Sequence, residues 1–375
     1  MSDSAAKAAA NTPDDPEFAP RTKVPLVSVI VLSYNAIDVV RTCFPSVCTS
    51  TYSNLEIIFA DNASTDATAE WIQSTYPDVK VIRHPENYYF CRGNNEAVAR
   101  ASGKYIVLLN NDVEVDPDWL QPLVDRMESD ENIGAVQPKL LQHQDRNRFE
   151  YSGGAGGHLD RFGYPFTRGR IFFEMERDNG QYDQDEQIFW ATGAAILLRR
   201  DLYRKIGGLD ERFKMHMEEI DLCWRLQRSG YRIESVCASV VFHIGGASLP
   251  RGNPEKTYLN YRNNLLTLYK NLPDAIWLKI FPIRIMLDGL AIVRLLFLLK
   301  GGEAWSILKA YNDVHRLKSA VADERPAPDE RVVIPFYRRS IVLDYYLRRI
   351  RTFSALPRSH FLTGRESDQG SPKLP

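Results

Sequence analysis

The sequence predicts an α/β fold in which a mainly parallel central sheet is flanked by helices. Short apolar runs alternate with helix-length segments through the first part of the chain, and this alternation is typical of parallel, doubly wound sheets. The run from Tyr105 to Leu109 is continuous and rich in β-formers, and it ends in Asn110, Asn111 and Asp112. Because ligands bind at the carboxyl ends of strands in open α/β sheets, we expect a ligand site at this edge.

Size and charge limit the classes of protein. The chain has 375 residues, enough for one large domain with appendages or for two domains. Its formal net charge of −1 provides no positive field, so we expect no nucleic-acid partner. Five scattered cysteines indicate thiols in a reducing cytoplasm. We expect neither a secretion signal nor a spanning helix, because the required apolar stretches are missing.

The first part of the chain predicts four strands with helices between them. Residues 1–23 are rich in Ala, Asp, Pro and Ser, and we expect them to be disordered. The expected strands are 27–32, 55–60, 79–84 and 105–109. The expected helices are 36–48, a segment capped by Ser64, Thr65 or Asp66 that runs to Thr75, a segment near 96–101 that residues 93–95 start or lie within, and 117–130.

The stretch 143–187 is polar and contains a glycine cluster at 153–157. A loop of this length inside a compact domain is usually functional, so we expect a lid or a binding loop. Beyond it, glycines end two predicted helices, and two short strands follow. These elements are 200–206, 218–229, 231–236 and 239–243.

A helical extension is expected over 251–321. Residues 275–299 are apolar, with charged interruptions at Lys279, Arg284, Asp288 and Arg294. This pattern suits a helix, or a pair broken at Pro282, that lies in a membrane interface with its basic groups at lipid headgroups. A helix packed on its own domain has the same pattern, so both interpretations stay open. The Pro- and Arg-rich tail, 322–375, is expected to dock on the domain or on lipid.

The residues Asn110 to Asp112 also allow two interpretations. Oxygen ligands at a strand end suit a hard divalent cation that bridges phosphates. Asn-Asn-Asp is equally good turn chemistry, and the residues alone do not decide between a turn and a metal site.

Several blocks, taken together and in order, resemble family 2 glycosyltransferases of the GT-A (nucleotide-diphospho-sugar transferase) fold, especially their rhamnosyltransferase-like branch. The blocks are 27–35, 61–66, 93–95, 109–113, 207–211, 218–225, His243 and Ser248. The resemblance implies a GT-A domain over 24–250 that transfers a sugar from a nucleotide-sugar donor with inversion at the anomeric carbon. The branch implies a deoxyhexose donor such as dTDP-rhamnose. It also implies a glycan or lipid-linked glycan acceptor. With the apolar extension over 275–299, we expect a peripheral location at the inner face of the cell membrane.

The resemblance implies a divalent cation, Mn²⁺ or Mg²⁺, at Asp112. Asn110 stands where the family has the first acid of its Asp-x-Asp motif, and an amide oxygen brings no charge, so we expect weaker metal binding. His243 matches a second metal ligand, since imidazole binds such ions, although a lone histidine is often structural.

The resemblance also implies a catalytic acid pair. The matching residues are Glu218 and Glu219, at the start of a predicted helix, and Glu219 aligns with the base that removes the acceptor proton. Asp221 is expected to orient the acceptor or to be structural. Acids at a helix N-terminus are also favoured by the helix dipole, so a purely structural role fits the residues too.

The remaining site residues follow from the same resemblance. The expected donor contacts are Ser33, Tyr34, Asn35, Asp61, Arg92, Gly93, Asn94, Asn110 and Asn111, and the expected acceptor contacts are Trp190, Thr192, Gly193 and Asp221. Arg92 suits a diphosphate or simply the surface, and Trp190 suits a sugar face or simply the core.

Two alternatives come from other classes of protein. A nucleotidyltransferase shares the strand–helix alternation, but the first strand is not followed by a Gly-rich loop bearing a lysine. A nucleotide-sugar-binding scaffold without catalysis is supported only by the substitutions at Asn110 and Glu219.

Overall fold

The computed structural model describes residues 24–245, 252–327 and 336–362. The predictions for residues 1–23, for Ser248 and for the end of the tail lie outside these ranges. All five cysteines are unpaired thiols, as expected. Within the described ranges, no helix is both long and apolar enough to cross a bilayer.

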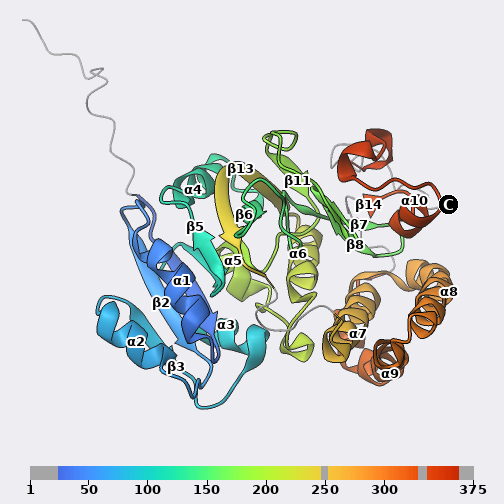
Figure 1. Cartoon of the computed structure of the whole chain (residues 1–375), viewed down its shortest axis with the longest axis horizontal. Coiled ribbons are helices and arrows are strands. Elements are labelled where there is room, and N and C mark those ends of the chain that lie inside the picture. The colour runs from blue at the N-terminus through green and yellow to red at the C-terminus, as the bar shows by residue number, and fades with distance from the viewer. Residues whose placement is uncertain (1–23, 246–251, 328–335, 363–375) are drawn as a thin grey trace, which may run out of the picture.

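A central mixed sheet organises the molecule (Figure 1). Its strand order in the described part of the chain is β11-β13-β6-β12-β4-β1-β2-β3, with β5 added beside β13. The strands are β1 Val27–Ser33, β2 Leu55–Asp61, β3 Lys80–Arg83, β4 Tyr105–Asn110, β5 Val113–Val115, β6 Ile133–Gln142, β11 Glu186–Ile188, β12 Ala195–Arg199 and β13 Arg232–His243. The first four strands run parallel, as predicted, whereas β12 lies antiparallel to both β4 and β6.

Helices cover both faces of this sheet because alternate strand residues point to opposite sides. The helices are α1 Ile37–Cys48, α2 Thr68–Thr75, α3 Tyr89–Ala99, α4 Leu120–Ser129, α5 Arg200–Lys205 and α6 Glu218–Arg228. Val29 and Val107 pack with α1, α2 and α4, whereas Ile30 and Ile106 pack with α3, α5 and α6. The fold class predicted from the sequence is therefore confirmed.

Three predicted elements differ from the structure. The predicted loop over 143–187 is wrong, because this stretch folds into a second, smaller sheet. Its strands are β7 Gly157–Asp160, β8 Pro165–Thr167, β9 Arg170–Ile171 and β10 Glu174–Met175. The helix expected near 96–101 begins earlier, at Tyr89, and residues 93–95 lie within it, which is one of the two positions expected. The two strands expected after 231 form one strand, β13, whose register shifts between Val236 and Val240.

The C-terminal extension is helical, as predicted. It contains α7 Pro254–Asn271, α8 Asp274–Phe297, α9 Gly301–Leu317 and a 3₁₀ helix, Lys318–Glu324. α8 passes through Pro282 without a break. The described part of the tail docks on the second sheet: β14 Phe336–Tyr337 pairs with β7, and α10 Ile341–Tyr346 follows. In Figure 1 the extension lies beside the second sheet, at the end of the molecule opposite α2.

Candidate active site

A cavity of about 870 Å³ lies at the carboxyl ends of β1 and β4. These strands are parallel neighbours, with Leu32 opposite Asn110, so their polar ends meet at one edge. Asn111 Nδ2 donates a hydrogen bond to Ser33 Oγ at 2.9 Å and joins the two ends directly. The edge predicted from the sequence therefore lines this cavity.

His243 links two acids beside this edge. Its Nε2 lies 3.0 Å from Asp112 Oδ1, and its Nδ1 lies 3.3 Å from Glu150 Oε2, with all three residues buried. Burial would raise the pKa of the Asp112 carboxyl, but the positive charge and hydrogen bond of His243 hold it below its ordinary value. Burial would lower the pKa of His243, yet Glu150 and Asp112 raise it well above the ordinary value. The three groups therefore form a charged unit inside the protein.

The donor chemistry of this unit fits part of a metal shell. A carboxylate oxygen of Asp112 and a deprotonated imidazole nitrogen of His243 are competent ligands for manganese-like ions, so a cation that binds here would displace the proton that the raised pKa of His243 retains. Among the described residues, however, no three His, Cys, Asp or Glu side chains are arranged to hold an ion by themselves. A cation here would need further ligands from a bound diphosphate.

Glu218 and Glu219 enter the same cavity from the N-terminus of α6. Burial, followed by the nearby charge of Glu219, raises the pKa of Glu218 well above its ordinary value. Burial likewise raises the pKa of Glu219, to about 7. The Oε2 atoms of both residues are buried without a protein hydrogen-bond partner. Such orphaned acceptors are costly, and the cost is relieved when a ligand donates to them.

Most of the predicted site residues meet at this cavity. The residues that line it are Ser33, Tyr34, Asn35, Asn110, Asn111, Asp112, Thr192, Gly193, Glu218, Glu219 and His243. Tyr34 is 48 % exposed and lies at the rim. A Cβ atom at Gly193 would lie 3.7 Å from Glu218 Oε1, so the predicted acceptor residues are next to the acid pair.

Three of the predicted donor residues, 92–94, lie outside the cavity lining on α3. Arg92 stacks on Tyr88 at 3.5 Å and pairs with Glu86 at the surface, so it does not reach the site. Gly93 and Asn94 instead serve the packing of α3: a Cβ at 93 would lie 2.8 Å from Leu32 Cδ1, and Asn94 donates to a backbone carbonyl in its own helix.

Asp61 is buried at the end of β2, where its Oδ2 accepts a hydrogen bond from the Ser64 amide at 3.1 Å. The cavity is lined by the next residue, Asn62. Trp190 is also a core residue. Its ring packs on Gly157 and its Nε1 donates to the His158 carbonyl at 3.0 Å.

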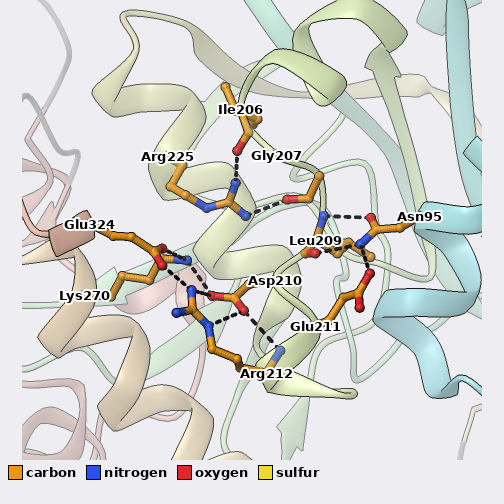
Figure 2. Close-up of a pocket in the computed structure, with 11 residues that line it drawn as sticks. Asn95, Ile206, Gly207, Leu209, Asp210, Glu211, Arg212, Arg225, Lys270 and Glu324 are labelled. Carbon is orange, nitrogen blue, oxygen red and sulfur yellow. Dashed lines mark hydrogen bonds and ion pairs between the residues drawn. The ribbon is translucent and has the colours of Figure 1, made fainter. Parts of the chain in front are cut away.

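Asp221, also on α6, does not line the cavity. Its Oδ2 accepts from Arg225 Nε at 2.8 Å and from Lys270 Nζ at 3.1 Å. Arg225 and Lys270 belong to a polar network that lies beside a second cavity of about 400 Å³ (Figure 2). In that network Lys270 also pairs with Asp210, at 2.7 Å, and with Glu324, at 3.0 Å. The predicted acceptor contact Asp221 therefore pairs with the charges of this network and does not lie at the cavity.

Sequence reasoning missed several residues around the site. Glu150 lies in the polar stretch that has no regular periodicity, so no local signal marks it as a partner of His243. The loop before α6 and the first turns of α7 also contribute to the wall. These missed lining residues are Lys214, Met215, His216, Glu255, Lys256 and Leu259.

Comparisons with known proteins define the class first. The crystal structure of GalNAc-T7 with UDP, GalNAc and Mn²⁺ superposes with a TM-score of 0.53 at 17% identity, covering 67% of this chain and 49% of that one. The fold is thus that of the GT-A glycosyltransferases. The sequence profile described as Glycosyl transferase family 2 matches residues 28–207. The chain therefore contains a domain of glycosyl transferase family 2.

Two curated relatives illustrate the range of similar proteins. O-antigen biosynthesis protein RfbC of Myxococcus xanthus is 31% identical over 252 residues, which are 64% of this chain and 19% of RfbC. This chain thus spans about a fifth of that relative. The N-acetylglucosaminyl-diphospho-decaprenol L-rhamnosyltransferase of Mycobacterium tuberculosis is 24% identical over 237 residues, 58% of this chain and 76% of that enzyme.

Proposed function

We propose that this protein transfers a glycosyl group from a nucleotide diphosphate sugar to a hydroxyl group of a glycan or lipid-linked glycan, with inversion at the anomeric carbon. The observation that supports this most strongly is that Asp112 and His243 line the same cavity as Glu218 and Glu219. The first pair suits a leaving diphosphate, and the second suits the hydroxyl that displaces it.

At the donor end, Asp112 and His243 would hold a divalent cation, Mn²⁺ or Mg²⁺. Such a cation supplies positive charge that stabilises the departing diphosphate. Asn110 and Asn111 offer amide groups to the donor from the end of β4, and Ser33 to Asn35 offer polar groups from the end of β1. One acid and one imidazole bind a cation more weakly than two acids, so the nucleotide diphosphate is needed to complete the site.

At the acceptor end, Glu219 is the general base. As the acceptor oxygen bonds to the anomeric carbon, its proton moves to a Glu219 carboxylate oxygen, and the bond from that carbon to the diphosphate oxygen breaks. A pKa of about 7 suits this task, because the carboxylate is partly deprotonated at neutral pH and still basic enough to take the proton. Burial and the nearby charge of Glu219 raise the pKa of Glu218 well above its ordinary value. Two neighbouring negative charges oppose each other, which favours ionisation of one carboxyl group of the pair at a time.

The substrates are inferred from the relatives. A rhamnose-like deoxyhexose donor is supported by the resemblance to the rhamnosyltransferase-like branch and by the name of the mycobacterial relative. That name also supports an acceptor joined to a polyprenyl diphosphate. Together they suggest a role in synthesis of a cell-surface glycan.

A location at the inner face of the cell membrane is supported by α8. Two charged side chains of this helix lie inside, where Arg284 pairs with buried Asp288 at 3.2 Å, whereas Lys279 and Arg294 are exposed. Tyr311 of α9 donates to the same carboxylate at 2.6 Å. Its exposed side is apolar over several turns, at Leu278, Ile285, Met286, Leu290, Val293, Leu296 and Phe297. A helix with this inverted distribution suits an apolar neighbour such as lipid.

A thermal-shift screen of nucleotide sugars, with and without Mn²⁺, tests the proposal first. A ligand that binds only the folded state raises the melting temperature, so the donor should be the nucleotide sugar that raises it most. Transfer to a lipid-linked acceptor, with NMR of the product anomer, then tests the reaction. An inverted product supports it. Donor binding without turnover would favour a binding scaffold instead.

A further inference from the structure

The loop that leads into α6 has an unusual backbone. Lys214, His216 and Met217 have φ angles of +65°, +68° and +68°. Residues other than glycine rarely adopt this region, and they keep it only where the surroundings hold the chain in place. Met217 directly precedes Glu218 and Glu219, so the conformation of this loop determines where the two carboxylates point.

Asn263 of α7 holds the loop by its side-chain amide. Its Nδ2 donates to the carbonyl oxygens of Phe213 at 3.0 Å, Met215 at 2.8 Å and His216 at 2.7 Å. Two amide protons serve three acceptors, so one proton is shared. Asn263 Oδ1 accepts from Arg262 Nε at 2.8 Å, which turns the NH₂ group toward the loop. Asn263 is fully buried.

Other contacts hold the start of the loop from two sides. Arg262 Nη2 donates to the carbonyl oxygens of Arg212 and Phe213 at 2.9 and 3.0 Å. On the opposite side, the backbone amides of residues 90–91, in the first turn of α3, both donate to the Lys214 carbonyl at 3.0 Å. The loop therefore lies between α3 and α7 with its carbonyl groups satisfied by both.

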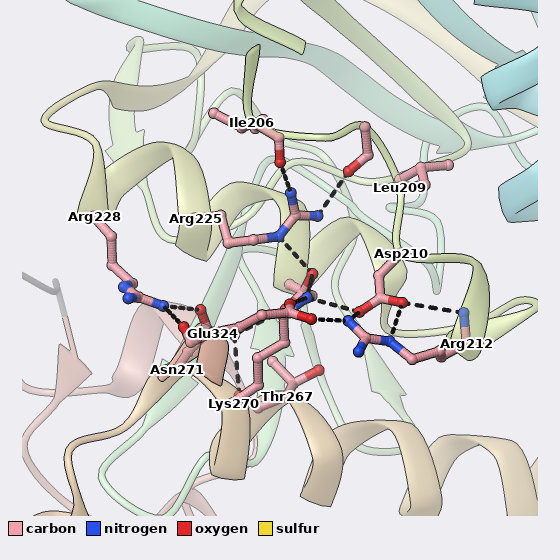
Figure 3. A network of polar contacts seen from close by, with 12 residues as sticks. Ile206, Leu209, Asp210, Arg212, Arg225, Arg228, Thr267, Lys270, Asn271 and Glu324 are labelled. Atoms are coloured by element: carbon pink, nitrogen blue, oxygen red, sulfur yellow. Dashed lines mark hydrogen bonds and ion pairs between the residues drawn. The ribbon is translucent and has the colours of Figure 1, made fainter. Parts of the chain in front are cut away.

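The same face of α7 also holds α6. Lys270 and Asn271 are seven and eight residues after Asn263, which places them on one side of the helix. Lys270 Nζ lies 3.1 Å from Asp221 Oδ2, and Asn271 Nδ2 donates to Asp221 Oδ1 at 2.9 Å. Figure 3 shows Lys270 and Asn271 within this network, next to Asp210, Arg212 and Glu324. α7 therefore contacts both the loop 213–217 and helix α6, which carries Glu218 and Glu219.

We propose that Asn263 is a positioning residue: it keeps loop 213–217 in its left-handed conformation and thereby directs the carboxylates of Glu218 and Glu219 toward the acceptor. The inference rests on the proposed glycosyl transfer and deepens it. Asn263 does not line the cavity, so it acts through the loop. Asn263 belongs to α7, which lies beyond the residues that match the family profile, so the C-terminal extension contributes this positioning contact.

The full-length variant Asn263→Asp tests this role, because it removes the amide protons at almost unchanged size. Asn264→Asp is the matched control. Asn264 is the next residue of α7 and is also buried, but its Nδ2 donates to the Gly163 carbonyl, at 2.8 Å, away from the loop. The measurements are kcat and donor KM with dTDP-rhamnose and Mn²⁺, and amide hydrogen exchange of the segment 213–219.

We expect Asn263→Asp to lower kcat about 10- to 100-fold, since small misplacement of a reacting group has effects of this size. The donor KM should change by less than about twofold, because the substitution does not alter the donor end of the cavity. A general structural defect would instead change both kcat and the donor KM. Exchange over 213–219 should accelerate. Asn264→Asp should change neither. Wild-type kcat and exchange in Asn263→Asp, or equal changes in both variants, would overturn the proposal.

Two further results also decide the question. If Asn263→Asp fails to fold by circular dichroism, Asn263→Ser, which adds no charge, replaces it with the same criteria. If the wild type transfers no sugar from any donor, the proposed function is refuted, but hydrogen exchange still tests the positioning role of Asn263. Faster exchange over 213–219 in the Asn263 variant than in the Asn264 variant supports the positioning role, whereas equal exchange refutes it.

Discussion

His243 Nε2 lies 3.0 Å from Asp112 Oδ1, although 131 residues separate the two in the chain. The antiparallel pairing of β13 with β5 creates this contact, because it sets His243 opposite Val113. The Ile244 amide adds a hydrogen bond to the Asp112 carbonyl at 3.0 Å. The carboxylate and imidazole are therefore held by backbone pairing at the cavity edge, before any donor binds.

Asp112→Asn should remove the effect of Mn²⁺ on donor binding, because it removes the carboxylate of the proposed metal pair. We expect Mn²⁺ to tighten binding of dTDP-rhamnose to the wild type by about tenfold or more, which is about 1.4 kcal/mol. Calorimetric titrations with and without Mn²⁺ measure this effect. Asp118→Asn, at an exposed position nearby, should behave like the wild type. An undiminished Mn²⁺ effect in Asp112→Asn would exclude the residue as a ligand.

Glu219→Gln should abolish transfer and keep donor binding. The amide retains the shape of the side chain but cannot accept the acceptor proton, and loss of a general base costs roughly 10²- to 10⁴-fold in kcat. Steady-state kinetics, combined with donor calorimetry, measure both effects. Exposed Glu131→Gln is the control. Transfer at the wild-type rate by Glu219→Gln would show that another group takes the proton.

kcat for transfer should increase as the pH is raised through about 7, because Glu219 acts as a base only when deprotonated and burial raises its pKa to about 7. This rise should be absent from whatever residual activity Glu219→Gln retains. Profiles of kcat against pH for both proteins measure it. A flat wild-type profile between pH 5.5 and pH 8.5, on the order of one and a half units around that pKa, would contradict the assignment.

Glu219 should also make the free energy of unfolding depend on pH. This free energy should fall as the pH rises, whereas kcat should increase. The folded state binds more protons than the unfolded state between the ordinary pKa of Glu219 and its raised value of about 7. Its contribution to stability is therefore fully present below the ordinary pKa and is lost as the pH rises through about 7. Denaturant unfolding of the wild type and of Glu219→Gln at several pH values measures the contribution of Glu219 to the free energy of unfolding. An identical pH dependence for the two proteins would contradict the raised pKa.

Charged residues at the turn between α8 and α9 should release the protein from lipid. Phe297 and Leu299 are 84 % and 93 % exposed, and burying each would be worth about 1.5–3 kcal/mol. Replacing both by Asp should lower partitioning onto phosphatidylglycerol vesicles by more than about tenfold, as flotation would measure. Phe173→Asp, at another exposed phenylalanine in the second sheet region, should float like the wild type. Equal flotation of all three proteins would refute lipid contact through this turn.

Local patterns predicted the central sheet well. The strands at 27, 55 and 105 begin at the predicted residues. β1 and β4 are buried along almost their whole length, as expected for central strands, whereas β2 is buried only from Ile58 onward. α6 and α7 also begin where acids or proline mark a helix start. The second sheet was missed because its strands have only two to four residues, too few for a periodic pattern.

The sequence by itself determined the α/β order, the polar strand ends and the acids that compete for a catalytic role. Only the tertiary structure decided which of them meet: it joined His243 to Asp112, moved Asp221 and Trp190 out of the cavity, and placed Asn263 against the loop before α6. The physical reason is that helices and strands depend on neighbouring residues, whereas a site depends on how distant segments pair and pack, which no local pattern records.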